Sequence, residues 1–299
     1  MFNFDNKTYR KIFGEAWRTI PILQIVAKSL LKYQYSFLTP NELGKLFQTR
    51  NPASRRAYWI ELLKQIHLTS STSVFRTLKW LDSMTGSYEN QNYLGFGASF
   101  RGFLEASADS VYTLNGIAKT LAKNRQKIFP LLNLDPSARF VIIKDLEDLL
   151  NHYAFARGSA TVKQEEIDFG VEFPNAHRAK TTRTYLDSIG SPRVHDCYTT
   201  LCEITHPAMR SVWSFVSVKD SLGTLFELSN QLDKKLISKL CQDYQDVLER
   251  LLQISANIPI MTFRVLNSYS VREISTPIAN KINLKNVLAW NDIDKYLNQ

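Results

Sequence analysis

The chain has few of the residues that cross-link a protein or make it flexible. Three cysteines, 11 glycines and 10 prolines occur among its 299 residues. An odd number of cysteines with no C-x-x-C pair argues against a disulfide framework, and so few glycines and prolines leave little room for long linkers. We therefore expect an ordered protein in a reducing, cytoplasmic environment.

Long apolar runs are also missing. The most apolar stretch, residues 20–31, is interrupted by Pro21, Gln24 and Lys28 and is shorter than the roughly 20 residues that span a bilayer. Residues 1–10 lack the apolar core of a secretion signal. We expect neither an integral membrane protein nor an exported one, and no membrane partner.

The common catalytic signatures are absent. The sequence contains no Walker loop, G-x-G-x-x-G, G-x-S-x-G or H-E-x-x-H motif, which argues against nucleotide-driven chemistry and the commonest hydrolases and metalloproteases. His195, Cys197, Cys202 and His206 could be combined into a metal site, but their spacing matches no zinc signature. Cysteine is more often a small buried hydrophobic residue. We expect no metal and no cofactor.

Positive charge is concentrated near the N-terminus. Residues 1–80 hold 13 Lys and Arg against four Asp and Glu, an excess of nine, whereas residues 81–299 hold 24 of each. A positive field in one region favours contact with a polyanion such as nucleic acid, because neutralised phosphates release counterions. A solvated basic surface without a ligand explains the same pattern.

Apolar residues recur at helical spacing along most of the chain, which predicts an all-α fold. The pattern predicts a basic helical region over residues 1–85, a helical bundle over 86–270 and a C-terminal tail over 271–299. The expected helices are 8–33 with a break at Pro21, one starting at Thr39-Pro40, then 52–66, 72–84, 99–123, 136–153, 181–189, 197–216 with a break near Pro207, and 222–254. Residues 86–97 and most of 158–193 are expected to be loops, 271–277 a short strand, and 293–297 a terminal turn.

Two predicted helices carry polar groups on otherwise apolar faces. Arg101 and Glu105 lie one turn apart in Phe100-Arg-Gly-Phe-Leu-Glu-Ala, and Glu203 and His206 lie three apart in Tyr198-Thr-Thr-Leu-Cys-Glu-Ile-Thr-His-Pro. If the two helices are neighbours, Arg101, Glu105 and His206 converge, and His206 then lies within hydrogen-bonding or one-water reach of Arg101 or Glu105. An arginine and a histidine facing a carboxylate are suited to acid/base chemistry on a phosphodiester.

The same two segments resemble HEPN-type helical domains of bacterial abortive-infection and toxin proteins. The resemblance covers residues 96–252. It implies a HEPN-like bundle with Arg101, Glu105, Glu203 and His206 as its polar, candidate catalytic cluster. Many members of that superfamily are metal-independent ribonucleases of toxin or phage-defence systems, often with the site assembled across a homodimer, whereas others only bind nucleotides or partner proteins.

One feature departs from the pattern of active members of that superfamily. These usually carry an arginine four to six residues before a histidine on one helix, but the nearest arginine before His206 is Arg193, thirteen residues upstream. Three alternatives to a ribonuclease therefore stay open. The cluster can be a buried, mutually satisfied network that holds the helices in register, or the chain can be a non-catalytic subunit that binds nucleic acid or a defence-system partner protein.

The third alternative is a sequence-specific DNA-binding regulator. Residues 63–84 can be read as a helix, a Ser/Thr turn and a second helix that places residues 72–81 in a groove of the duplex. For either nucleic acid, RNA being favoured, the expected contacts are with the basic side chains of this region. These are Arg50, Arg55, Arg56, Arg76 and Lys79.

Overall fold

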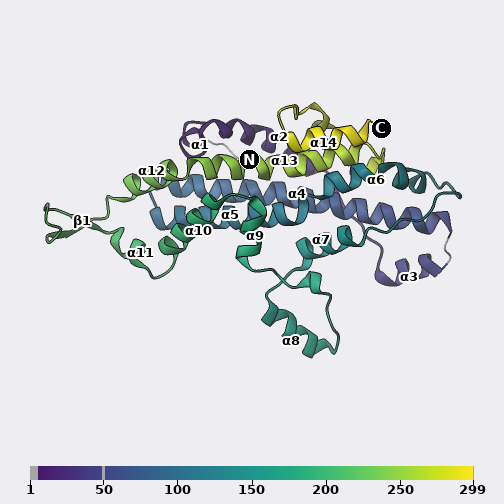
Figure 1. Ribbon diagram of the computed structural model, residues 1–299, viewed down its shortest axis with the longest axis horizontal. Coiled ribbons are helices and arrows are strands. Elements are labelled where there is room, and N and C mark those ends of the chain that lie inside the picture. Colours follow the sequence, from purple (N-terminus) through teal and green to yellow (C-terminus); the bar gives the residue numbers. More distant parts are fainter. Residues whose placement is uncertain (1–5, 49–50, 299) are drawn as a thin grey trace. The chain divides into compact units, whose positions relative to one another are not determined.

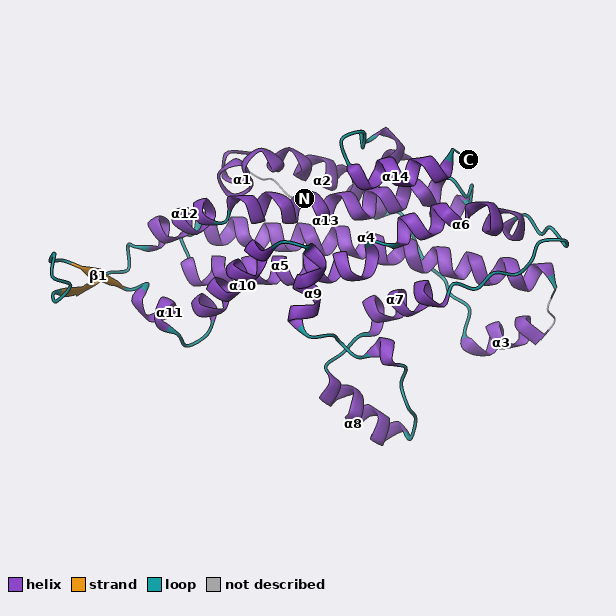
Figure 2. Cartoon of the chain, in the orientation of Figure 1, coloured by secondary structure: helices purple, strands orange, loops and turns teal. Residues whose placement is uncertain are grey.

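The computed structural model describes residues 6–48 and 51–298, and most of these are helical (Figure 2). Within this part of the chain the strands β1 (Val216–Val218) and β2 (Phe226–Leu228) form one antiparallel hairpin. The expected all-α fold class is confirmed. The α-helices, labelled in Figure 1, are α1 (Asn6–Phe13), α2 (Thr19–Leu30), α3 (Pro40–Gln48), α4 (Pro52–Glu89), α5 (Tyr93–Leu114), α6 (Ile117–Leu132), α7 (Lys144–Phe155), α8 (Ser159–Phe169), α9 (Thr182–Ile189), α10 (Pro192–Thr205), α11 (Met209–Trp213), α12 (Asp233–Asp243), α13 (Gln245–Asn267) and α14 (Leu288–Leu297); 3₁₀ turns lie at Gly14–Arg18, Asn175–His177, Arg272–Ile274 and Pro277–Lys281.

The chain forms two compact units, each assembled from three separate segments. Unit 1 consists of Met1–Gln24, Phe75–Val111 and Thr182–Ala256, and unit 2 of Ile25–Val74, Tyr112–Thr181 and Asn257–Gln299. These boundaries differ from those of the three contiguous regions expected from the sequence, 1–85, 86–270 and 271–299. The functional roles expected of those regions stay a prediction. Each unit is described below by itself.

The core of unit 1 is built around α5. Phe96, Phe100 and Phe103 are fully buried, and the ring of Phe103 meets that of Phe13 edge-on at 6.2 Å. Two glycines let other helices approach α5 closely. A Cβ atom at Gly97 would lie 2.6 Å from the Ile204 side chain of α10, and one at Gly102 would lie 2.3 Å from the indole of Trp80. These close approaches fix the surface on which α10 lies.

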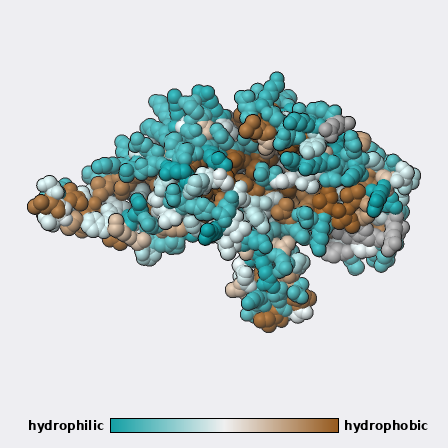
Figure 3. Space-filling model, in the orientation of Figure 1, coloured by the Kyte–Doolittle hydropathy of each residue, from teal (hydrophilic) through white to brown (hydrophobic). Residues whose placement is uncertain are grey.

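Unit 1 also carries a largely uncovered apolar extension. Helix α11 and the hairpin expose nine large apolar side chains, and Figure 3 shows hydrophobic surface gathered where Figure 1 places β1. Leu222 and Leu228 are the most exposed of these, each at 83%. Within this extension the rings of Trp213 and Phe226 meet edge-on, with their centroids 5.2 Å apart. The nine residues are Met209, Val212, Trp213, Phe215, Val218, Leu222, Leu225, Phe226 and Leu228.

Unit 2 contains a buried polar network around His67, whose side chain is fully buried. One ring nitrogen, Nδ1, lies 2.6 Å from the Tyr35 hydroxyl, and the other, Nε2, lies 2.8 Å from Thr276 Oγ1. The Tyr33 ring lies 4.5 Å away and the Phe263 ring 5.1 Å away. Both nitrogens are therefore satisfied inside an aromatic enclosure.

The expected helix-turn-helix is wrong. Residues 63–84 form one uninterrupted part of α4, so no turn separates two helices there; the burial of Val74, Leu78 and Leu81 is as expected of the second helix. The hydroxyls that suggested a turn bond back to carbonyls of the preceding helical turn, as Ser71 does to His67. Such bonds satisfy serine and threonine inside a helix.

Several other expected boundaries are also wrong. Residues 86–97 belong mostly to α4 and α5, and the expected helix 99–123 is broken between α5 and α6 at Asn115-Gly116. The helix expected from Pro136 begins only at Lys144, and residues 159–169 form α8 rather than a loop. The hairpin includes residues 222–228, so the helix expected over 222–254 begins only at Asp233. A 3₁₀ turn replaces the strand expected over 271–277, and α14 is longer than the expected terminal turn. In the N-terminal segment the helix breaks at Gly14–Arg18, and Pro21 lies in the first turn of α2.

Other expectations are confirmed. Helix α9 matches the helix expected over 181–189, and α3 begins at Pro40 as expected from Thr39-Pro40. The α3 start is a capping box, because Thr39 N donates to Glu42 Oε2 at 2.7 Å and Glu42 N donates to Thr39 Oγ1 at 3.3 Å. None of the described helices has the length and apolar character that crossing a lipid bilayer requires.

Candidate functional site

The site in unit 1 starts with an ion pair on α5. The Nε group of Arg101 donates to Glu105 Oε1 at 3.0 Å, the one-turn pair expected from their spacing. The Arg101 side chain is 25% exposed and that of Glu105 is 40% exposed, so both remain accessible from solvent. An ion pair this exposed contributes little stability by itself, roughly 0–1 kcal/mol.

Helix α10 supplies the facing histidine where it ends. His206 has φ −104° and ψ 165°, and its backbone N donates to Cys202 O at 2.9 Å. The next residue is Pro207, which disfavours helical geometry at the residue before it. The sequence His206-Pro207 therefore ends α10 at Thr205 and leaves the histidine in extended conformation, with an exposed side chain.

Five side chains from α5 and the end of α10 form one hydrogen-bonded group, the Arg101 cluster. It comprises Arg101, Glu105, Tyr198, Thr205 and His206. Arg101 Nη1 donates to His206 Nε2 at 2.7 Å and to Thr205 Oγ1 at 3.3 Å, and Arg101 Nη2 donates to the Tyr198 hydroxyl at 3.2 Å. The Tyr198 hydroxyl in turn donates to Glu105 Oε1 at 3.0 Å.

The environment fixes the protonation of two members of the cluster. Partial burial lowers the pKa of Arg101, but the hydrogen bond and charge of Glu105 outweigh it, so the net pKa lies above its ordinary value. Burial, followed by the negative charge of Glu105, raises the pKa of Tyr198. At neutral pH Arg101 is therefore a permanent cation and Tyr198 a neutral phenol that can donate a proton.

The contact with Arg101 also defines the state of His206. A guanidinium has only donors, so Nε2 of His206 must accept and cannot carry a proton in this arrangement. The ring is then the neutral tautomer with its proton on Nδ1. A neutral imidazole beside a fixed cation, both reachable from solvent, is the combination needed to take a proton from a nucleophile next to a developing negative charge.

The expected proximity of His206 to Arg101 is confirmed, with 2.7 Å between Nε2 and Nη1. Glu203 does not join the cluster, because its carboxylate pairs with Arg210. The sequence argument for Glu203 assumed that His206 was helical, whereas α10 ends one residue before it. The catalytic roles of these residues stay a prediction.

Two members of the cluster were missed by sequence reasoning, although a signal was present. Tyr198 and Thr205 are seven residues apart, which is two helical turns, so they share a face of α10. A helical projection of the segment before His206 would have placed both hydroxyls beside the histidine. Their contribution is to hold Arg101 in position from α10.

No family model, curated protein or solved structure matches this chain. The resemblance to HEPN domains therefore stays a prediction that rests on the two short segments. The site must be judged on its geometry.

The basic side chains proposed to contact nucleic acid have different surroundings. Arg50 lies outside the described residues. Arg55 and Arg56 donate to the carbonyls of Ala138 and Leu132 in unit 2, at 2.8 and 2.9 Å, and Arg76 pairs with Asp109 in unit 1 at 2.7 Å. Lys79 is exposed. Three of these five arginines and lysines thus make contacts within the protein, and contact of the basic region with nucleic acid stays a prediction.

The cysteines and histidines weighed as metal ligands are not gathered into one site. His195 pairs with Asp187, and His206 faces Arg101. Cys197 is a buried free thiol whose pKa is raised by burial, and Cys202 is a half-buried free thiol. Over residues 6–48 and 51–298, no group of three or more His, Cys, Asp or Glu side chains is placed to hold a metal ion.

Proposed function

We propose that the Arg101 cluster cleaves RNA without a metal ion, and that the chain is a toxin-like effector of a bacterial defence system. The observation that carries the proposal is the direct contact between Arg101 and the exposed His206. RNA contains its own nucleophile, the 2′-hydroxyl, so a base and a cation are enough to promote cleavage. The resemblance of the two segments to HEPN domains supports the same chemistry.

The chemistry assigns a task to each side chain. His206 Nε2 takes the proton of the 2′-hydroxyl as its oxygen forms a bond to phosphorus, and the bond from phosphorus to the 5′-oxygen breaks. Arg101 neutralises the charge that develops on the non-bridging oxygens. The departing 5′-oxygen receives a proton from the histidine or from Tyr198, which leaves a 2′,3′-cyclic phosphate and a 5′-hydroxyl. Substrate must first replace the Arg101–His206 hydrogen bond, so cleavage requires a small movement of either side chain.

The test is a comparison of matched variants in a bacterial host and with purified protein. Wild type, Arg101→Ala and His206→Ala are expressed, total RNA is examined for fragments, and fragment ends are analysed for cyclic phosphate. We expect cleavage by the wild type to persist in a chelator and to fall by roughly 100-fold or more in both variants, the size of loss typical for a general base or a charge-stabilising group.

The same helix offers two controls. Arg193 and His195 lie on α10 and pair with Asp246 and Asp187, outside the cluster, so Arg193→Ala and His195→Ala should cleave like the wild type. Soluble yield and melting temperature are measured for every variant. Intact RNA with folded wild-type protein, or full activity in folded His206→Ala, would refute the proposal.

A second candidate function is a non-catalytic subunit that binds a partner protein. The apolar extension at α11 and the hairpin favours it, because nine large apolar side chains within residues 209–228 are each 44–83% exposed. Exposed apolar surface of this kind marks protein–protein contacts more often than a free monomer surface. If RNA stays intact, replacing Leu222 and Leu228 with serine should abolish association with the partner and leave the fold unchanged.

A further inference from the structure

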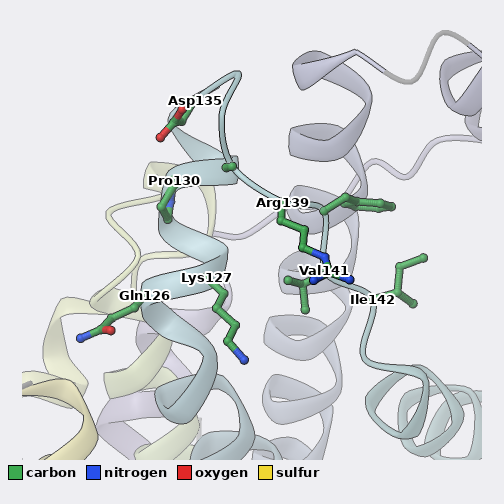
Figure 4. A pocket seen from close by; sticks show the side chains of 9 residues that line it. Gln126, Lys127, Pro130, Asp135, Arg139, Val141 and Ile142 are labelled. Atoms are coloured by element: carbon green, nitrogen blue, oxygen red, sulfur yellow. The ribbon is translucent and has the colours of Figure 1, made fainter.

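Unit 2 contains a surface pocket that the proposed function does not use. Its volume is about 540 Å³, and it lies between the C-terminal half of α6 and residues 135–142, which follow that helix (Figure 4). Pockets of about 300–1,000 Å³ are typical of small-molecule sites. The volume is thus large enough for a ligand of nucleotide size.

One wall of the pocket is fixed by α4. Arg55 Nη1 donates to Ala138 O at 2.8 Å, and Trp59 Nε1 donates to Val141 O at 3.1 Å. The ring of Phe140 packs edge-on against that of Tyr58 at 5.3 Å. Residues 138–141 lie outside any helix or strand, yet two hydrogen bonds from α4 side chains to their carbonyls and a ring contact hold them. A wall held in this way does not have to be ordered by the ligand, which lowers the cost of binding.

The pocket combines two cations with an apolar surface. Lys127 extends from α6 and Arg139 from the fixed wall, and both side chains are exposed (Figure 4). Within the part of the chain that the structure describes, neither forms an ion pair. The pocket's one carboxylate, Asp135, accepts hydrogen bonds from Ser137 N and Oγ, which lower its pKa and keep it ionised, so one negative charge stands against the two cations of the lining. Pro130 and Ile142 add apolar surface.

We propose that this pocket binds a nucleotide. Its phosphate lies between Lys127 and Arg139, which supply hydrogen bonds and charge from two walls. Its base and ribose lie along the apolar surface of Phe140 and Ile142, since bases stack on aromatic and apolar side chains. A mononucleotide and one nucleotide of a single strand share this chemistry, and the test separates the two.

The proposal does not depend on RNA cleavage. The pocket belongs to unit 2 and shares no residue with the Arg101 cluster of unit 1. Nucleotide binding is therefore measured in the absence of any reaction. If the protein binds nucleotide but does not cleave RNA, only the cleavage proposal fails; if it cleaves RNA but does not bind nucleotide, only the binding proposal fails.

The test is calorimetric titration of the full chain with AMP, UMP, adenosine and inorganic phosphate, up to millimolar concentration. We expect both mononucleotides to bind, and adenosine and phosphate each to bind at least tenfold more weakly. Affinity for AMP should fall as salt is raised, because phosphate contacts by cations are screened. A short 2′-O-methyl oligonucleotide, which lacks the nucleophile for cleavage, shows the source: binding tighter than AMP indicates a strand, and equal or weaker binding indicates a free nucleotide.

Substitutions of pocket residues test whether the ligand binds in this pocket. Lys127→Ala and Arg139→Ala should each weaken AMP binding roughly tenfold, the effect of losing one charge-assisted hydrogen bond. Ile142→Ser should weaken AMP but leave inorganic phosphate unchanged. Lys235→Ala removes the same charge from an exposed position of α12 and should bind like the wild type.

Three results would overturn the proposal. One is the absence of heat with millimolar AMP and UMP. Another is inorganic phosphate binding as tightly as AMP, which would make the pocket a simple anion site. The last is equal affinity of Lys127→Ala, Arg139→Ala and Lys235→Ala, which would place the nucleotide elsewhere.

Discussion

Acid should destabilise the protein through His67. Burial lowers the pKa of this histidine from 6.5 to about 4, because its fully buried ring cannot be hydrated when it carries a charge. In the unfolded chain the ring titrates near its ordinary pKa. Between about pH 6.5 and 4 the unfolded state therefore binds a proton that the folded state does not, and the free energy of unfolding decreases as the pH falls through this window.

The magnitude follows from the two pKa values. One pKa unit corresponds to about 1.4 kcal/mol, so the shift of His67 removes about 3 kcal/mol of stability by pH 4 and about 2 kcal/mol by pH 5, relative to pH 7.5. That is a large part of the roughly 5–15 kcal/mol by which a typical domain is stable. Carboxylates with lowered pKa, such as Glu166, add a further loss at more acidic pH.

The assay is urea unfolding followed by circular dichroism at pH 7.5 and pH 5.0, for wild type and His67→Gln. Glutamine keeps polar atoms near Tyr35 and Thr276 but does not titrate, so the carboxylate contribution is common to both proteins and cancels in the comparison. We expect the wild type to lose about 2 kcal/mol more than His67→Gln between the two pH values. His195→Gln, a substitution of a partly exposed histidine, is the control. Equal losses in wild type and His67→Gln would refute the reasoning.

Two further predictions concern packing and exposure. Gly102→Ala should lower the melting temperature although alanine is the better helix former, because its Cβ would lie 2.3 Å from the rigid indole of Trp80. A Cβ at Gly86 meets nothing within 4 Å, so Gly86→Ala should stabilise α4 by about 0.5–1 kcal/mol. Melting temperatures of the two variants that shift in the same direction would contradict this. Leu228→Ser should change the free energy of unfolding by less than about 0.5 kcal/mol, since that side chain is 83% exposed, and a larger loss in urea unfolding would show that the hairpin is covered.

Where local chemistry decides the structure, the sequence was informative. The Thr39 and Glu42 side chains form their capping box within four residues, and the Arg101–Glu105 pair needs only one helical turn. The meeting of Arg101 with His206 was a conditional expectation, because it required α5 and α10 to be neighbours. Helical spacing alone cannot establish that neighbourhood, which here depends on Gly97 and its contact with Ile204.

Where the same spacing of apolar residues is compatible with two structures, the prediction from sequence was wrong. The spacing of Leu222, Leu225 and Leu228 is helical, yet these residues belong to the hairpin, whose turn is set by Asp220 and by Gly223 at φ +71°. The apolar spacing of residues 136–153 is likewise helical, but α7 begins only at Lys144. Asp135 accepts a hydrogen bond from Ser137 N in a turn, and side chains of α4 hold residues 138–141 outside any helix. In both cases an aspartate side chain accepts hydrogen bonds from nearby backbone N–H groups and so stabilises a turn. The spacing of apolar residues carries no information about such bonds.

The interleaving of the two units affects how the protein is made. Unit 1 lacks its last segment until residue 256 has been translated, and unit 2 lacks residues 257–299 until later still. The usual order of biosynthesis, in which an N-terminal domain folds while the rest is being translated, is therefore not available to this chain. Each unit can complete its core only after its last segment has been synthesised, so a chain that ended before residue 256 would leave both units incomplete.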